Sequence, residues 1–113
     1  MIIWAAIALA LLVTGITILA GRGTIPANGL IGIRTPAVQR TSTTWTVGHR
    51  AATPTLVTLS AVALVVGTVA FFATRQSTGD TADFVGLGLF AVDLIGIIAA
   101  ALRANSAARR DLR

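Results

Sequence analysis

The chain has 113 residues, of which 55% are hydrophobic and only 12% are charged. Soluble domains carry about a quarter charged residues, and one of this length could not bury so much apolar surface. The composition therefore excludes a cytosolic enzyme, a disordered tail and a solvated DNA-binding domain. Nine Arg and four Asp give a net charge of +5, and the absence of Cys excludes disulfides and thiolate metal sites.

Three apolar segments follow one another along the chain, at about residues 2–20, 54–74 and 83–102. Each is long enough to cross a hydrocarbon core of about 30 Å as a helix that rises about 1.5 Å per residue. The sequence therefore predicts an all-α membrane protein with a single domain over residues 1–113. We expect a bundle of three transmembrane helices with a structured loop between the first two.

A cleaved signal peptide is the competing interpretation of the first segment. The segment has no basic residue before its apolar run, and the run exceeds the core of roughly 7–15 residues that is usual in signal peptides. We therefore expect it to be retained as the first transmembrane helix.

Arginine placement predicts the orientation. Eight of the nine Arg lie in the loop 21–53 or in the tail 103–113, whereas the short connection after the second span has only Arg75, opposed by Asp80 and Asp83. The positive-inside rule puts the loop and the C-terminus in the cytoplasm and the N-terminus outside, in a multi-pass protein of the cell (inner or plasma) membrane.

The bilayer and anionic lipid headgroups are its expected partners. No stacking or base-reading pattern indicates nucleic-acid binding.

The absence of Cys makes this orientation testable. A single Cys at Ser77 should react with an impermeant maleimide in intact cells, whereas a single Cys at Ser106 should react only after the membrane is opened. The reverse pattern of labelling would overturn the orientation.

Small residues recur at steps of three and four in each span, which is the spacing that lets helices pack closely in a bilayer. Asp93 is the only charge between Phe84 and Leu102 in the third span. A carboxylate there costs about 2.5–3.5 kcal/mol on insertion scales, so it should face the interior. By depth, Thr14 and Ser60 are its expected hydrogen-bond partners. Asp93 is interpreted as a contact between helices, as a relay for protons or substrate, or as a contact to another subunit.

The loop from residue 21 to residue 53 is too long for a tight turn. Thr41, Ser42 or Thr43 is expected to cap a short interfacial helix over residues 42–52. Trp45 and His49 are four residues apart and share a face of that helix. Thr53 and Pro54 have the types expected at the N-cap and first position of the second span.

The order of residues in this loop resembles the signature of the SdpI family of small bacterial membrane proteins. The resemblance lies in Asn28, in the run Gly32-Ile33-Arg34-Thr35-Pro36, and in Trp45 followed four residues later by His49-Arg50. The chain is similar to a short, three-helix form of the family. The resemblance implies immunity to a secreted peptide, or envelope-stress signalling, exerted through the segment from Asn28 to Arg50 with a possible cytoplasmic protein partner.

The same residues suggest one binding site. Arg34 can hold a carboxylate or phosphate through its planar fork, and Asn28 with the backbone around Gly32 and Thr35 can add donors. Trp45, His49 and Arg50 would complete it at the membrane surface, the two rings forming a stacking wall.

The alternative function is an accessory subunit of a larger membrane complex that docks through small-residue helix faces and Asp93. A membrane enzyme or transporter is the least favoured interpretation, because catalysis needs converging groups and His49 lies about half a bilayer from Asp93. With one His and no Cys, we expect no metal and no cofactor.

Overall fold

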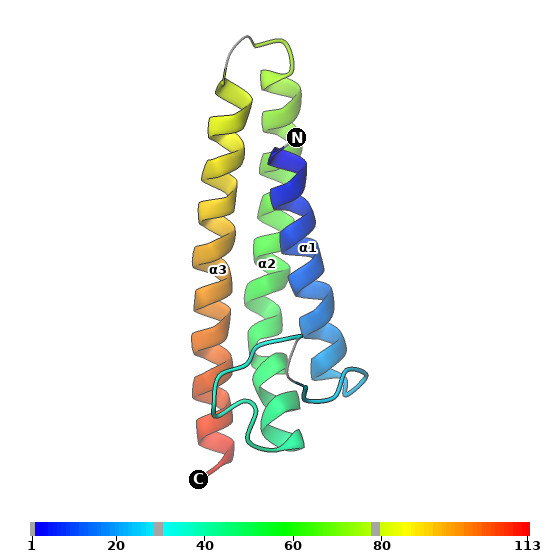
Figure 1. The fold of residues 1–113 in the computed structure, drawn as a ribbon, viewed down its shortest axis with the longest axis vertical. Helices are drawn as coiled ribbons and strands as arrows, with labels where there is room; N and C mark the ends of the chain where they lie inside the picture. Colours follow the sequence, from blue (N-terminus) through cyan, green and yellow to red (C-terminus); the bar gives the residue numbers. More distant parts are fainter. Residues whose placement is uncertain (1, 29–30, 78–79) are drawn as a thin grey trace.

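The computed structural model describes residues 2–28, 31–77 and 80–113. It contains three helices, α1 (Ile2–Gly21), α2 (Ser42–Thr74) and α3 (Thr81–Asp111). Figure 1 shows them side by side, with α2 running opposite to α1 and α3, in a bundle of 55 × 22 × 21 Å. All three are long and apolar enough to cross a membrane. The predicted fold class, an all-helical bundle of three transmembrane helices, is confirmed.

Helix α2 differs from the prediction, because the expected interfacial helix over residues 42–52 is not separate from the second span. One helix of 33 residues runs through Thr53 and Pro54. Proline lacks the N–H that would bond the carbonyl four residues earlier, yet here the neighbouring turns are fixed by packing, since Ala52 and Leu56 are both buried. The Thr53 hydroxyl donates to the His49 carbonyl at 2.8 Å instead of capping a new helix.

The start of α2 is set by Thr41. The Thr44 N–H donates to Thr41 Oγ1 at 3.0 Å, and the Thr41 N–H donates to Thr44 Oγ1 at 2.9 Å. This reciprocal pair is a capping box with Thr in place of the usual Glu or Gln. Two donors that the first turn leaves unpaired are thereby satisfied, which places the start of the helix at Ser42, well before Pro54, where the apolar segment begins.

Helix α3 continues through most of the predicted basic tail. Its last turns bury Ala100, Ala104 and Ala108 at a spacing of four, so one narrow face lies against the bundle. Arg109 and Arg110 occupy the last turn, where positive charge is favoured by the helix dipole. The tail is thus helical up to Asp111 because it has α2 to pack against.

Small residues form the contact surfaces between the helices. Buried positions on α1 are spaced by three or four, and a Cβ atom added at Gly67 of α2 would lie 2.6 Å from Ile7 Cδ1. Leu94, Ile95 and Ile98 of α3 point outward instead, although Leu89 of the same helix is buried. The small faces therefore hold the bundle together and the bulky faces are left for lipid, as expected for helices packed in a bilayer.

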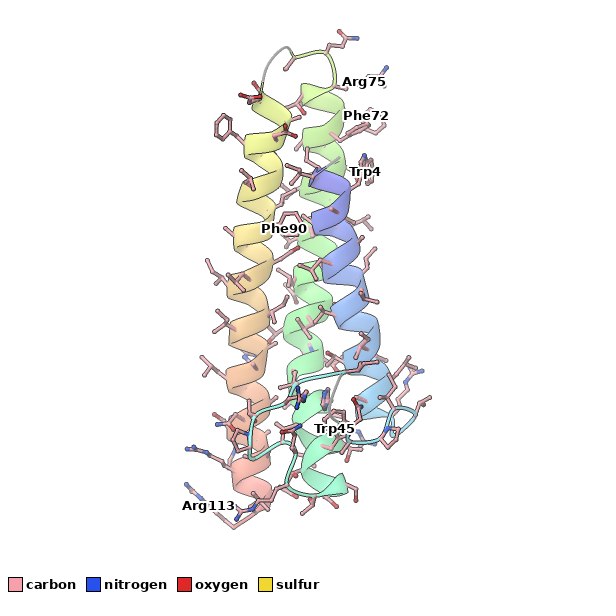
Figure 2. The ribbon with its side chains drawn as sticks, viewed as in Figure 1. Trp4, Trp45, Phe72, Arg75, Phe90 and Arg113 are labelled. Carbon is pink, nitrogen blue, oxygen red and sulfur yellow. The ribbon has the colours of Figure 1, made fainter. Side chains whose placement is uncertain are left out.

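The two ends of the bundle differ in charge and in the burial of tryptophan. Figure 2 shows Trp4, Phe72 and Arg75 at one end and Trp45 and Arg113 at the other. Trp4 is 39% exposed and contacts Phe71 with ring centroids 5.0 Å apart, which suits an interfacial anchor. Trp45 is only 1% exposed, so its role is inside the protein.

Candidate functional site

The segment between α1 and α2 folds back over the end of the bundle, and its first half is fixed to α2 by two hydrogen bonds. The indole Nε1 of Trp45 donates to the Ile25 carbonyl at 2.9 Å, and the Ile33 N–H donates to His49 Nε2 at 2.9 Å. Figure 1 shows this segment crossing α2 towards α3 before it returns to the start of α2. Side chains from one face of α2 therefore hold the loop in place.

The hydrogen bonds of His49 define its protonation. Its Nδ1 lies 2.7 Å from the Trp45 carbonyl, and its Nε2 accepts from Ile33. An imidazolium has no acceptor nitrogen, so this arrangement requires the neutral ring with its proton on Nδ1. The ring is fully buried and lies 4.3 Å, centroid to centroid, from that of Trp45. His49 thus acts as a fixed acceptor for the loop backbone.

Gly32 is the loop residue that lies against these two rings. Its φ is +103°, and a Cβ atom there would come within 2.8 Å of His49 Nε2 and 2.9 Å of Trp45 Cη2. Both the left-handed backbone and the close approach require a residue without a side chain. We define Gly32, Trp45 and His49 as the latch. The predicted stacking wall is therefore not open to a ligand, because the loop covers both rings.

Asn28 and Thr35 shape the loop through local hydrogen bonds. Asn28 donates through Nδ2 to the Pro26 carbonyl at 2.9 Å and accepts the Ile31 N–H at 2.7 Å. Thr35 Oγ1 accepts the Val38 N–H at 3.3 Å, with Pro36 at the first position of the turn that follows. These are the turn-forming roles usual for Asn, Thr and Pro.

The turn after Thr35 attaches the second half of the loop to the bundle. It carries Val38, which is fully buried, into contact with Gly48 of α2. The Thr44 hydroxyl donates to the Val38 carbonyl at 3.1 Å. Both ends of the run from Gly32 to Val38 are thus fixed to α2.

Arg50 connects α2 to the end of α1. Its Nε donates to the carbonyl of Gly21, the last residue of α1, at 2.8 Å. Carbonyls in the last turn of a helix lack partners within the helix, and a cation there is favoured by the dipole. Arg50 therefore has a structural role apart from the latch.

Arg34 is exposed, as Gly32 and Arg50 are, and it lines a pocket of about 460 Å³. With the Gln39 amide turned to the orientation that satisfies its neighbours, its oxygen accepts from Arg34 Nε at 3.1 Å. Within the described part of the chain, no hydrogen bond engages the two terminal nitrogens of the guanidinium. Those nitrogens can bind a carboxylate or phosphate. The pocket is lined by Val13, Ile16, Thr17, Gly32, Ile33, Arg34, Thr35, Ile97 and Ala101.

The intramembrane polar residues do not combine as predicted. The Thr14 and Ser60 hydroxyls lie 2.6 Å apart, and they also reach the Leu56 carbonyl at 2.9 Å and the Ala10 carbonyl at 3.0 Å, respectively. The close approach of α1 and α2 thus satisfies both hydroxyls. Asp93 is fully buried, and neither carboxyl oxygen has a hydrogen-bond partner among the described residues.

This burial also bears on the accessory-subunit alternative. Asp93, Ala10 of α1 and Gly67 of α2 are buried between the chain's own helices, whereas Gly15 and Gly88 are exposed. These surfaces are therefore not open to another subunit in this structure.

The described residues also contain no group of three His, Asp or Glu side chains arranged to hold a metal ion.

Several contributors to the site could not be singled out from the sequence. Gln39 lies four residues after Thr35, but nothing in its position indicates that it contacts Arg34. Val13, Ile16 and Ile97 have the apolar character of lipid-facing residues throughout the spans, so the sequence does not mark them as lining a pocket. The start of α2 at Ser42 agrees with the start expected for the short helix, and the three-residue spacing of Thr41 and Thr44 is the signal that could have singled out Thr41 from the three expected caps.

Comparison with known families agrees with the motif in the loop. The sequence model of the SdpI/YfhL protein family matches residues 24–102, a range that contains the latch, Arg34, all of α2 and most of α3. No curated protein and no solved structure gives a significant match. The match covers well over half of the chain and confirms the resemblance on which the sequence analysis relied. The chain therefore belongs to the SdpI/YfhL protein family.

Proposed function

We propose that the chain is a non-enzymatic membrane protein that acts in immunity to a membrane-active peptide, or in envelope-stress signalling, through the segment from Asn28 to Arg50. In this proposal the segment lies on the cytoplasmic side, where eight of the nine Arg are found. The observation that carries the proposal is the pairing of a fixed loop with an exposed cation. Gly32 and Ile33 are held on α2, while the next residue, Arg34, is exposed at a pocket.

Arg34 is the proposed recognition group. Its fork can bind the carboxylate of a peptide or the phosphate of a lipid, and Gln39 restricts the guanidinium by holding Nε. A restricted cation on a fixed loop loses less conformational freedom on binding than a free surface arginine does. Ligand binding at Arg34 would change the conformation of the loop backbone, which is hydrogen-bonded to His49 through the neighbouring Ile33 N–H. Any cytoplasmic partner that contacts the loop would then respond to the ligand.

The proposal predicts a graded effect of substitutions at Arg34. Cells that lack the native gene and carry a plasmid copy are exposed to culture supernatant of the same strain, and survivors are counted. We expect wild type to protect, Arg34→Lys to protect less because the fork is lost, and Arg34→Ala not to protect. Arg40→Ala is the matched control, because Arg40 is an exposed arginine of the same loop that does not line the pocket. Full protection by Arg34→Ala, at equal amounts in the membrane, would refute the proposal.

A further inference from the structure

We propose that the pocket beside Arg34 holds one acyl chain of an anionic phospholipid from the loop-side leaflet, with the lipid phosphate bound by the guanidinium. This inference rests on the proposed function in using Arg34 as the recognition group, and it names the class of ligand. It adds a second recognition element, because the apolar part of the pocket would select a chain and not only a charge.

Most of the side chains that line the pocket are apolar. Val13 and Ile16 come from α1, Ile97 and Ala101 come from α3, and Ile33 comes from the loop. Of the two lining hydroxyls, that of Thr17 donates to the Val13 carbonyl at 2.8 Å, and that of Thr35 accepts the Val38 N–H at 3.3 Å. Among the described residues that line the pocket, Arg34 is the single charged one. An apolar cleft with one cation at its edge matches an amphiphile with one negative charge.

The depth of the pocket favours a membrane lipid over a water-soluble anion. Helix α1 has 20 residues and a length of about 30 Å, equal to a hydrocarbon core. The lining residues Val13 and Ile16 lie in its second half, towards the loop. The pocket is thus level with the acyl chains of that leaflet, whereas Arg34 belongs to the loop beyond the end of α1. In this proposal a lipid chain enters from the side, between α1 and α3, which both contribute lining residues, without leaving the hydrocarbon.

The loop side of the pocket is already ordered before a ligand binds. Gly32, Ile33 and Thr35 belong to the run that the latch and the turn at Val38 fix to α2. Binding then requires little ordering of the backbone, which favours affinity. The volume of about 460 Å³ lies within the range of about 300–1,000 Å³ found for small-molecule sites, and an acyl chain is a thin ligand that can fill such a cleft.

Native mass spectrometry of the full chain, released from detergent, tests the inference with dioleoyl phosphatidylglycerol and dioleoyl phosphatidylcholine in equal amounts. We expect one phosphatidylglycerol to be retained in preference to phosphatidylcholine. Arg34→Gln should reduce this preference by about fivefold, the effect of one arginine near an anionic surface, and Arg40→Gln should not. Ala101→Trp should fill the pocket and reduce retention of both lipids. Ala91→Trp is its matched control, since Ala91 is exposed on the same helix.

A competition on the wild-type chain keeps the test independent of how well the variants fold. Glycerophosphoglycerol, the headgroup without acyl chains, should not displace the bound lipid at concentrations where dioctanoyl phosphatidylglycerol does. Displacement by the bare headgroup, equal retention by Arg34→Gln, or undiminished retention by a folded Ala101→Trp variant would each overturn the inference. If lipid is bound as expected while Arg34→Ala still protects cells, the proposed function fails and the lipid site stands. If no lipid is retained while Arg34→Ala abolishes protection, the reverse holds.

Discussion

Gly32→Ala should release the loop from α2 and lower the free energy of unfolding by about 2–6 kcal/mol. Two costs combine at this position. A non-glycine residue held at a φ of +103° is strained by about 1–3 kcal/mol, and a methyl group forced against packed rings adds about 1–3 kcal/mol. The added Cβ would meet His49 Nε2 at 2.8 Å, the atom that accepts the Ile33 N–H. The substitution therefore acts on the bond that fixes the loop.

Gly23→Ala separates the two costs. Gly23 also has a left-handed backbone, with φ at +81°, but a Cβ atom there would meet nothing within 4 Å. We expect Gly23→Ala to lose only the strain contribution, about 1–3 kcal/mol, and to leave the loop attached. Unfolding by sodium dodecyl sulfate in mixed micelles measures the free energies of both variants. Equal losses at the two positions would show that contact with the latch contributes nothing.

Release of the loop can be seen directly through Trp45. In a Trp4→Phe background, Trp45 is the single fluorophore of its kind, and it is buried in the folded chain. Gly32→Ala should shift its emission to longer wavelength by exposing the indole to solvent, and trypsin should cleave faster after Arg34 and Arg40. Gly23→Ala should change neither measurement. An unshifted emission in Gly32→Ala would mean that the loop stays attached despite the added methyl group.

The three spans were predictable because hydrophobicity summed over about 20 residues is a strong signal. The junction at Thr53 and Pro54 was not, because both residues have the local preferences of a helix start. Whether a helix begins there depends on tertiary contacts, and the burial of Ala52 and Leu56 on either side decides for continuity. The helical tail has the same cause, since Ala104 and Ala108 become a helix face only in the presence of α2.

The residues of the candidate site could be predicted from the sequence, but which of them hold the loop and which is free to bind a ligand could not. The motif grouped Gly32, Trp45 and His49 with Arg34, and the structure brings these residues together around one segment of the loop. Sequence cannot tell an exposed ring from one beneath a loop, because both have the same residue type and spacing. The pocket depends on which side chains of α1 and α3 face each other, and an apolar span carries no pattern that specifies this.

Asp93→Leu is the substitution with the largest expected gain in stability. Leu has the branched shape of Asp with methyl groups in place of the carboxyl oxygens. Both oxygens are buried without a hydrogen-bond partner among the described residues, and leaving a buried polar group unsatisfied costs about 1–3 kcal/mol. Unfolding by sodium dodecyl sulfate should therefore show a gain of about 1–3 kcal/mol. Asp93→Asn should gain less, because an amide of the same size still lacks partners.

A gain in stability at Asp93 would bear on its function as well as on its packing. A group that weakens the fold is retained where it serves a purpose, and strongly destabilising polar groups within spans commonly mark functional positions. If Asp93→Leu is more stable yet no longer protects cells, the carboxyl has a role beyond packing. Its neighbours on α3 have packing roles: Leu89 packs against α1, and Gly96 packs against Leu59 of α2. If the Leu variant and the Asn variant, which has the size of Asp, are both less stable than wild type, the carboxyl is satisfied by a group beyond the described residues, and the interpretation of Asp93 as an unpaired buried acid is wrong.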